Sequence, residues 1–272
     1  MNKAKEERLP RKNTPDLWDG CWSREVSVEE DRFNLAKEEK TIRYQRIEKI
    51  IRERFGKVDG LRVIEIGAGA GTNAALLAKR GAAVTVLDYS EKVLLRSRDF
   101  FSRNNLEADF VCANALNLPT SLRQKYDIAM SFGLSEHFSG EERLQINKGH
   151  FELLKKGGVA FISVPNRLNL PYRIFKLAAE TLGFWRVGEE YPYTRKELAQ
   201  ICRRCGIGNF LFAADSLYWS FNFINPIRYL DRIIKKKFDS KPEYDCTKIR
   251  TEQGSFLDQY FSYALVLCAF KD

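Results

Sequence analysis

The sequence has no apolar run approaching the length of about 20 residues that crosses a bilayer, and its first twelve residues, MNKAKEERLPRK, are mostly charged. A secretory signal has an apolar core behind a basic start, so this beginning does not have that pattern. The 6 cysteines fall at no framework spacing. Cys202 and Cys205 have metal-ligand spacing but no second pair, so no metal site is expected there. We therefore expect free thiols and a reducing, cytoplasmic location.

Charge and aromatic residues gather in the C-terminal third of the chain. At 272 residues and 44% hydrophobic composition, the chain can bury the core of one α/β domain with additions. Its net charge is +9, and Arg167–Arg250 holds 16 Lys/Arg against 9 Asp/Glu among many aromatic side chains. A basic region of this kind has three interpretations: a solvated surface around an aromatic substrate cap, contact with an anionic membrane or lipid-like substrate, and RNA docking.

The most informative segment is Leu61–Ser90, LRVIEIGAGAGTNAALLAKRGAAVTVLDYS. It predicts an apolar strand, a turn through Gly67, Gly69 and Gly71, a helix, and a second strand that ends at Asp88. Such a turn directs backbone N–H groups and the positive end of a helix at one point. A carboxylate at the end of the second strand can accept hydrogen bonds from both hydroxyls of a ribose. The segment therefore predicts a nucleoside-containing cofactor.

The spacing of the glycines narrows the choice of nucleoside. A dinucleotide-binding turn requires G-x-G-x-x-G, whereas here the third glycine comes one residue early and Thr72 holds the dinucleotide position. Glu65, two residues before Gly67, would repel a pyrophosphate but could pair with an ammonium group. These features argue against an NAD-dependent oxidoreductase.

Short apolar strands alternate with helical patterns along most of the chain. This alternation indicates a parallel sheet with helices on both faces. For Thr194–Cys205 we expect a capping box between Thr194 and Glu197. The expected strands are Arg62–Ile66, Val84–Asp88, Ala108–Cys112, Tyr126–Phe132, Val159–Val164, Phe210–Ala214 and Tyr260–Phe270. The expected helices are Val28–Phe55, Thr72–Arg80, Glu91–Asn104, Glu141–Leu154, Leu168–Gly183, Thr194–Cys205 and an inserted segment, Ser220–Phe238.

The motif E-x-G-x-G-x-G followed by V-x-V-L-D resembles the first two motifs of class I S-adenosylmethionine-dependent methyltransferases. The resemblance extends from Leu61 to Asn166. It implies S-adenosyl-L-methionine as cofactor and an α/β fold: a Rossmann-like, doubly wound sheet of seven strands. In that fold the sheet is mostly parallel with a final antiparallel strand, has helices on both faces, and carries helical cap insertions.

Individual cofactor contacts follow from the same resemblance. It places Glu65 at the methionine end, Asp88 at the ribose and Asn114-Ala115 at the adenine. Many relatives have Asp where this chain has Asn114, whose amide oxygen can still accept a hydrogen bond; the alternative is a turn residue without a ligand. The cofactor-binding residues implied in this way are Glu65, Gly67, Ala68, Gly69, Gly71, Asp88, Tyr89, Asn114, Ala115 and Phe132.

The end of the fourth strand carries the candidate for catalysis. Ser131–Phe138 reads SFGLSEHF rather than the [DN]-P-P-[YF] of enzymes that methylate adenine in DNA or glutamine in proteins, and it resembles the branch that methylates small molecules. His137 could take a proton from a hydroxyl or a carbon acid; alternatively it packs against or caps the next helix. His150 is expected to have only a structural role.

The chain is thus expected to have three parts. Residues 1–60 form an N-terminal arm and helix, in which Trp18, Trp22 and the pair Arg43-Tyr44 either close over the cofactor or only pack. Residues 61–166 form the cofactor-binding core, and residues 167–272 form cap insertions plus the last two strands of the same domain. We expect methyl transfer to a small or lipid-like acceptor. The alternative is an RNA or protein methyltransferase that docks through the basic C-terminal half. The acceptor atom (O, N, C or S), membrane contact and the oligomeric state stay open.

Overall fold

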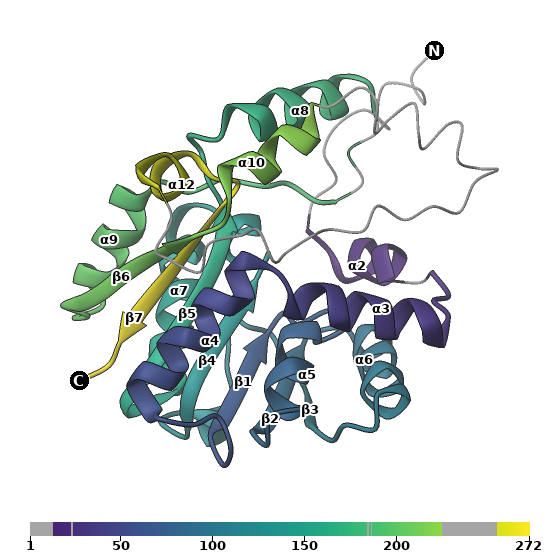
Figure 1. The fold of residues 1–272 in the computed structure, drawn as a ribbon, viewed down its shortest axis with the longest axis vertical. Coiled ribbons are helices and arrows are strands. Elements are labelled where there is room, and N and C mark those ends of the chain that lie inside the picture. The colour runs from purple at the N-terminus through teal and green to yellow at the C-terminus, as the bar shows by residue number, and fades with distance from the viewer. Residues whose placement is uncertain (1–12, 23, 184, 186, 225–254) are drawn as a thin grey trace.

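Seven strands form one sheet in the order β3-β2-β1-β4-β5-β7-β6 (Figure 1). The computed structural model describes residues 13–22, 24–183, 185, 187–224 and 255–272. Strands β1 to β5 pair in parallel, and β7 is antiparallel to both β5 and β6. The strands are β1 (Arg62–Ile66), β2 (Ala83–Asp88), β3 (Asp109–Cys112), β4 (Tyr126–Phe132), β5 (Leu154–Pro165), β6 (Asn209–Ala214) and β7 (Ala264–Phe270). The predicted fold class is confirmed, with the last two strands completing the same sheet.

Helices cover both faces of this sheet. One face packs against α4, α5 and α6, and the other packs against α7 and α9. The remaining helices lie near the carboxyl ends of the parallel strands (Figure 1). The helices are α2 (Pro15–Trp22), α3 (Val28–Glu39), α4 (Ile42–Phe55), α5 (Thr72–Ala78), α6 (Glu91–Arg103), α7 (Gly140–Leu153), α8 (Leu170–Thr181), α9 (Arg195–Arg204), α10 (Leu217–Ser220) and α12 (Phe256–Phe261). Single 3-10 turns occur at η1 (Thr120–Leu122), η2 (Ser135–His137) and η3 (Phe221–Phe223).

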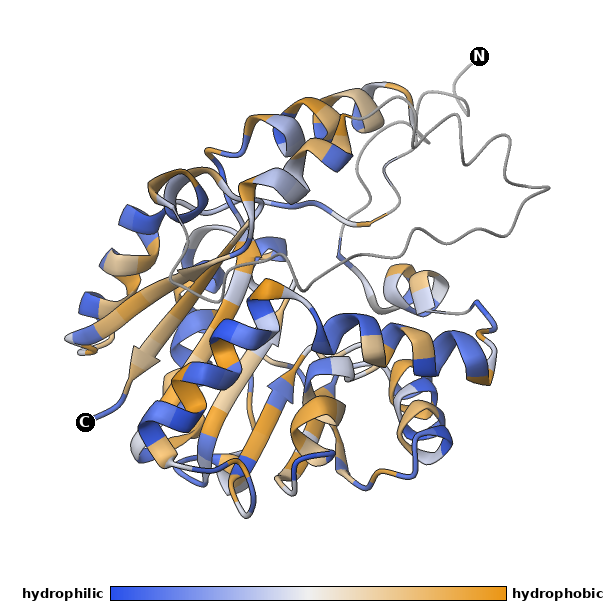
Figure 2. Cartoon of the chain, viewed as in Figure 1, coloured by the Kyte–Doolittle hydropathy of each residue, from blue (hydrophilic) through white to orange (hydrophobic). Residues whose placement is uncertain are grey.

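The strand residues divide between two hydrophobic clusters because successive side chains of a strand point to opposite faces. In β1, Val63 joins the cluster under α4 to α6, whereas Ile64 and Ile66 join the cluster under α7 and α9. Figure 2 shows the central strands in the hydrophobic colour, as expected for a sheet that is covered on both faces. In the described part of the chain, no helix has the length and apolar character needed to span a membrane, and the described cysteines form no disulfide.

The prediction of one long helix over Val28–Phe55 was wrong, because the structure has two helices there. The Thr41 side chain accepts the Tyr44 backbone N–H at 3.2 Å and caps α4, so α3 ends at Glu39. A capping threonine offers the backbone an alternative to the continuing helix. The apolar stripe continues across this break, and for that reason periodicity alone did not detect it.

Three other features differ from the prediction. Strand β5 begins at Leu154 rather than at Val159, so the segment Lys155–Gly158 belongs to the strand. Strand β7 begins at Ala264, because Ser255 and Asp258 form a capping box that starts α12 in front of it. Thr194 caps α9, but the Glu197 carboxylate binds Arg143 at 2.6 Å instead of completing the expected capping box. Of the predicted helical segment Ser220–Phe238, the part after residue 224 lies outside the described residues.

Candidate active site

A cavity of ≈860 Å³ opens at the carboxyl ends of β1, β2 and β4. Ligands of open α/β sheets bind at this edge, and the volume is in the upper part of the range of about 300–1,000 Å³ that is common for ligand pockets. Every predicted site residue except Gly71 lines its wall, including His137. Gly71 instead caps α5 at a φ of 74° and packs against Phe101 and Ser97, so its place in the structure is in the core.

Backbone conformation explains why glycine occurs in the turn after β1. Gly67 and Gly69 have φ values of 59° and 56°, in the left-handed region that side chains disfavour. A Cβ on Gly69 would overlap the Trp22 indole. The Gly69 N–H donates to Asp88 Oδ2 at 3.3 Å, and its carbonyl accepts from Ser97 Oγ at 2.9 Å. The turn is therefore braced from β2 and α6 before any ligand arrives.

Two buried carboxylates flank this turn. Glu65 is 2% exposed, and its Oε2 accepts the Ala74 N–H of α5 at 2.7 Å. Burial raises the pKa of the Glu65 carboxyl to about 8, against the opposing effect of the Ala74 N–H. Asp88 is 6% exposed, and burial also raises its pKa, although its Oδ1 accepts the Ser90 N–H at 3.1 Å. Both groups are costly to ionise at these buried positions, and a cationic ligand would reduce that cost for Glu65.

The N-terminal arm lies over the same cavity. Trp18 and Trp22 of α2 line the wall, and the Arg43 guanidinium lies 5.0 Å from the centre of the Phe132 ring. Arg43 also forms an ion pair with Glu38 at 2.7 Å. Of the residues expected to cover the cofactor, only Tyr44 lies elsewhere. It is buried in the core, where it packs against the Arg80 guanidinium, because neighbouring residues of a helix project about 100° apart around its axis.

The predicted adenine contacts lie at the other end of the cavity. Asn114 and Ala115 follow β3, and Tyr89 follows β2. The Asn114 Oδ1 accepts the Leu116 N–H at 2.9 Å, so its oxygen already serves the local turn. This contact supports the alternative role as a turn residue. A carbonyl oxygen has a second lone pair, so the contact with adenine stays a prediction.

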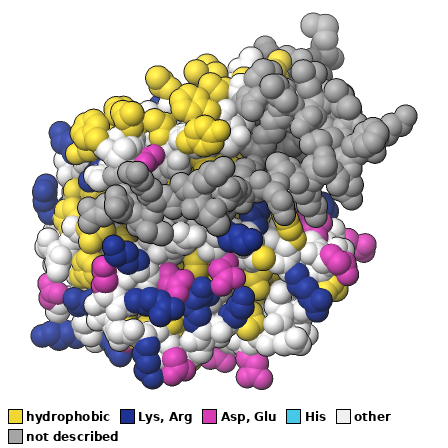
Figure 3. Space-filling view, viewed as in Figure 1, with side chains coloured by type: hydrophobic (Ala, Val, Ile, Leu, Met, Phe, Trp, Pro, Cys, Tyr) yellow, Lys and Arg dark blue, Asp and Glu magenta, His cyan; other side chains and the backbone are white. Residues whose placement is uncertain are grey.

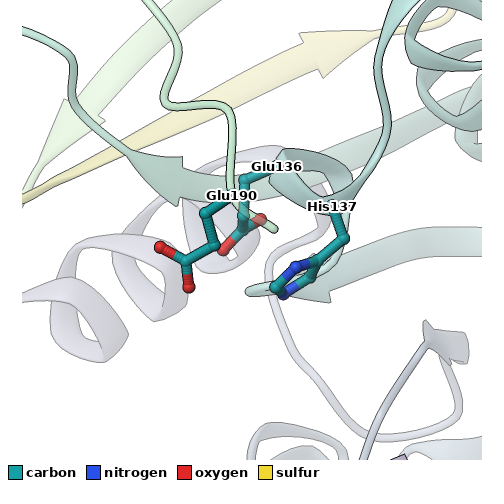
Figure 4. Close-up of side chains that lie close together, drawn as sticks. All are labelled: Glu136, His137 and Glu190. Carbon is teal, nitrogen blue, oxygen red and sulfur yellow. The ribbon is translucent and has the colours of Figure 1, made fainter. Parts of the chain in front are cut away.

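At the end of β4 the 3-10 turn η2 carries Glu136 and His137, and the loop before α9 brings Glu190 beside them (Figure 4). The His137 Nδ1 lies 2.8 Å from the Glu189 carbonyl oxygen, and its ring packs edge-on against Trp18. Burial lowers the pKa of His137 to about 4, so the imidazole is neutral at pH 7. His150, by contrast, is buried and bonded to Ser131 Oγ at 2.9 Å, which agrees with its expected structural role.

Sequence reasoning missed both glutamates. Glu136 is 3% exposed and lines the cavity, and burial next to Glu190 raises its pKa well above the usual value. Burial also raises the pKa of Glu190, although the Tyr172 hydroxyl donates to its Oε2 at 2.5 Å. The dipeptide Glu136-His137 was a usable signal. No pattern in the sequence links Glu190 to it, because the two segments meet only in the fold.

Comparison with known proteins gives one family and a set of relatives. A family described as "Methyltransferase domain" matches residues 63–158. The ubiquinone biosynthesis O-methyltransferase of Chromobacterium violaceum is 26% identical over 160 residues, which cover 57% of this chain and 68% of that protein. The Coxiella burnetii protein of the same name is 32% identical over 108 residues, which cover 40% of this chain and 45% of that protein. These curated relatives are thus matched over about half to two thirds of their length.

Solved structures with low identity share the fold. Magnesium protoporphyrin IX methyltransferase from Synechocystis, with bound S-adenosylhomocysteine, superposes with a TM-score of 0.54 at 16% identity and covers 84% of this chain and 83% of its own. A chain from the complex between the Haloferax volcanii Trm112 methyltransferase activator and a methyltransferase has a TM-score of 0.59 at 12% identity, with coverage of 93% and 97%. At such identities the likeness concerns the arrangement of the sheet and its helices.

Proposed function

Because this chain is a class I S-adenosylmethionine-dependent methyltransferase, we propose that it methylates a small or lipid-like acceptor held at the Glu136-His137 end of its cavity. The cofactor is S-adenosyl-L-methionine. One observation supports the proposal above the others: a single cavity runs from the glycine turn to His137, so one continuous space can hold both cofactor and acceptor. The name of the relatives, ubiquinone biosynthesis O-methyltransferase, also refers to methylation of a small molecule.

Within this cavity we assign the cofactor contacts as follows. Glu65 faces the ammonium group of the methionine part, and Asp88 accepts from the ribose hydroxyls. The turn around Gly67 and Gly69 brings backbone close to the ligand, where a Cβ would take up the space. The adenine lies toward Tyr89, Asn114 and Ala115, and Phe132 lies near the sulfonium group, at the border with the acceptor.

The reaction makes modest chemical demands on the protein. A sulfonium already makes its methyl group electrophilic, so the main task is to hold a nucleophile in line with the C–S bond. The new bond joins the acceptor atom to the methyl carbon, and the electrons of the C–S bond return to sulfur as S-adenosylhomocysteine forms. Trp18 and Trp22 exclude water from the site. The proton of the acceptor leaves toward His137, which is neutral and lies on the acceptor side of the wall.

The surface of the cap favours a lipid-like acceptor over RNA. On α8, Leu170, Ile174 and Leu177 are 70%, 56% and 68% exposed, and on α10 Tyr218 is 81% exposed. Figure 3 shows hydrophobic side chains gathered over α8 and α10. A cluster of exposed apolar side chains marks a surface for apolar partners, whereas a site for RNA presents mainly lysine and arginine.

A labelling experiment tests the class of acceptor. The purified protein is incubated with S-adenosylmethionine carrying a labelled methyl group, together with a metabolite extract, a lipid extract, total RNA or cell protein. We expect label in a product of the metabolite or lipid extract. Label found only in RNA or protein would overturn the proposed acceptor and favour the alternative.

The role of His137 has a separate test. In the His137→Ala variant we expect slower turnover and an altered pH profile, with unchanged calorimetric affinity for S-adenosylmethionine. Glu141→Gln, at an exposed position on the neighbouring helix, is the matched control and should behave as the parent protein. A His137→Ala enzyme with the parent rate and pH profile would leave that residue only a structural role.

A further inference from the structure

Three side chains of metal-binding type converge at the acceptor end of the cavity (Figure 4). One nitrogen of His137 and one carboxylate oxygen each of Glu136 and Glu190 lie within 4.8 Å of one another. Two of the three residues come from η2, directly after β4, and the third comes from the loop before α9. The strand ends and the cap therefore supply one common cluster.

The Glu136 side chain lacks the partners that a buried carboxylate needs. It is 3% exposed, and its Oε2 has no hydrogen-bond partner among the residues that the structure describes. Within the same residues, neither Glu136 nor Glu190 forms an ion pair. The nearby cations are engaged elsewhere, since Arg143 binds Glu197 and Lys176 binds Glu180. Burying a charged oxygen without a partner costs free energy, and a bound cation would offset that cost.

Outer contacts hold two of the three side chains in the orientation that metal ligands require. The His137 Nδ1 faces the Glu189 carbonyl oxygen at 2.8 Å, so Nδ1–H donates and the lone pair lies on Nε2. A metal-binding histidine commonly donates its other ring N–H to a carbonyl in this way. The Tyr172 hydroxyl donates to Glu190 Oε2 at 2.5 Å and orients that carboxylate.

The backbone around the cluster is also tied together. The Tyr191 N–H donates to the Glu136 carbonyl at 2.7 Å. Asn13, which precedes α2, donates through Nδ2 to the carbonyls of His137 and Glu189, at 2.8 and 3.3 Å. These bonds join the backbone of the loop before α9 to the backbone of η2, so the two segments that carry the three side chains are held together.

From this constellation we propose that Glu136, His137 and Glu190 bind a divalent first-row metal ion, such as Mn²⁺ or Zn²⁺, whose open coordination position takes an oxygen of the acceptor. Two carboxylates with one imidazole suit these hard to intermediate cations. Three protein ligands leave room for a further ligand from the cavity, as in catalytic metal sites.

The chemical consequence deepens the proposed methyl transfer and rests on it. A hydroxyl bound to the metal loses its proton to water near neutral pH, because the cation stabilises the resulting oxyanion. The oxyanion then forms the O–CH₃ bond while the C–S bond breaks toward sulfur. In this scheme His137 acts as a metal ligand. This role replaces the direct transfer of the acceptor proton to its imidazole ring.

Binding of Mn²⁺ alone tests the site without an acceptor. The full chain is treated with a chelator, dialysed and titrated with Mn²⁺ by calorimetry and by electron paramagnetic resonance, in which free Mn²⁺ gives the signal that bound Mn²⁺ loses. We expect one Mn²⁺ per chain, displaced by Zn²⁺. Glu136→Gln and Glu190→Gln should each weaken binding by about 100-fold or more, beyond the effect typical of an outer contact.

Glu141→Gln is the matched control, because its side chain is exposed on α7 and lies outside the cluster. It should keep the parent affinity, and calorimetry with S-adenosylmethionine checks that every variant is folded. Absence of Mn²⁺ and Zn²⁺ binding, or parent-like binding by both Gln variants, would overturn the metal site. Methyl transfer that persists in excess chelator would overturn the catalytic role of the metal while leaving the proposed function intact. Metal binding without any methylated product would count against the proposed acceptor alone.

Discussion

Binding of S-adenosylmethionine should release a proton from Glu65. In the free protein this carboxyl is largely neutral at pH 7, because burial raises its pKa to about 8. An ammonium group next to it favours the ionised form. At the same pH, Glu65 is therefore ionised in the complex and protonated in the free protein. Binding must release this proton into the solution.

The size of the effect follows from the shift of the pKa. Below about 8 the affinity should rise by about tenfold, or about 1.4 kcal/mol, for each unit of pH, as linkage of one proton requires. For the free protein the sign is the opposite. Since the pKa of Glu65 is raised on folding from 4.5 to about 8, its contribution to stability is fully present below 4.5 and is lost as the pH rises toward 8.

The Glu65→Gln variant isolates this carboxyl. Its amide oxygen can still accept the Ala74 N–H that Glu65 Oε2 accepts at 2.7 Å, so we expect a folded protein. The variant should bind S-adenosylmethionine without a pH slope. Near neutral pH the variant should bind S-adenosylmethionine more weakly than the parent protein by about 1.5–3 kcal/mol, which is the usual contribution of a hydrogen bond to a charged group. Glu107→Gln, at an exposed position away from the cavity wall, is the control.

Titration calorimetry in pairs of buffers with different ionisation enthalpies measures the protons released. The range between about pH 5.5 and pH 7 keeps the α-amino group of the ligand charged, since its pKa is about 8. A nucleoside thioether that lacks the amino-acid part, 5′-methylthioadenosine, should bind with no pH slope. An unchanged number of protons on binding, or a slope that survives in Glu65→Gln, would refute the placement of the ammonium group at Glu65.

Three further perturbations test the rest of the site and its support. Asp88→Ala should weaken S-adenosylmethionine binding by about 1–3 kcal/mol in calorimetry if the carboxylate holds the ribose, and unchanged affinity would contradict that role. Gly69→Ala should lower the affinity by about tenfold or more, because φ is 56° and the new Cβ overlaps the Trp22 indole; parent-like binding would show that the turn adapts. Asp31 is 1% exposed and forms ion pairs with Arg96 and Arg103. Asp31→Ala should lower the free energy of unfolding, measured in urea, by about 3–5 kcal/mol. A loss below about 1 kcal/mol would show that these ion pairs contribute little.

The sequence predicted the elements whose signals are local. Strands β1 and β4 have the bounds that the sequence predicts, because a strand pattern is complete within a few residues. The predictions that were wrong concern side chains for which two different contacts compete. Thr41 divides a helix whose apolar stripe continues, and Glu197 leaves its capping box for Arg143, which the fold brings close.

The sequence by itself determined the family and the cofactor, and it predicted most of the residues that line the cavity, because the glycine turn, Glu65 and Asp88 lie in one continuous strand–helix–strand segment whose geometry is locally encoded. Tertiary structure alone decided which of the remaining side chains reach the cavity wall. It packed Gly71 into the core, turned Tyr44 away from the cavity and placed Glu190 beside Glu136 and His137. These contacts join residues that are separate in the chain, so no local pattern predicts them, and the contact of Glu190 also requires the cap to pack on the strand ends.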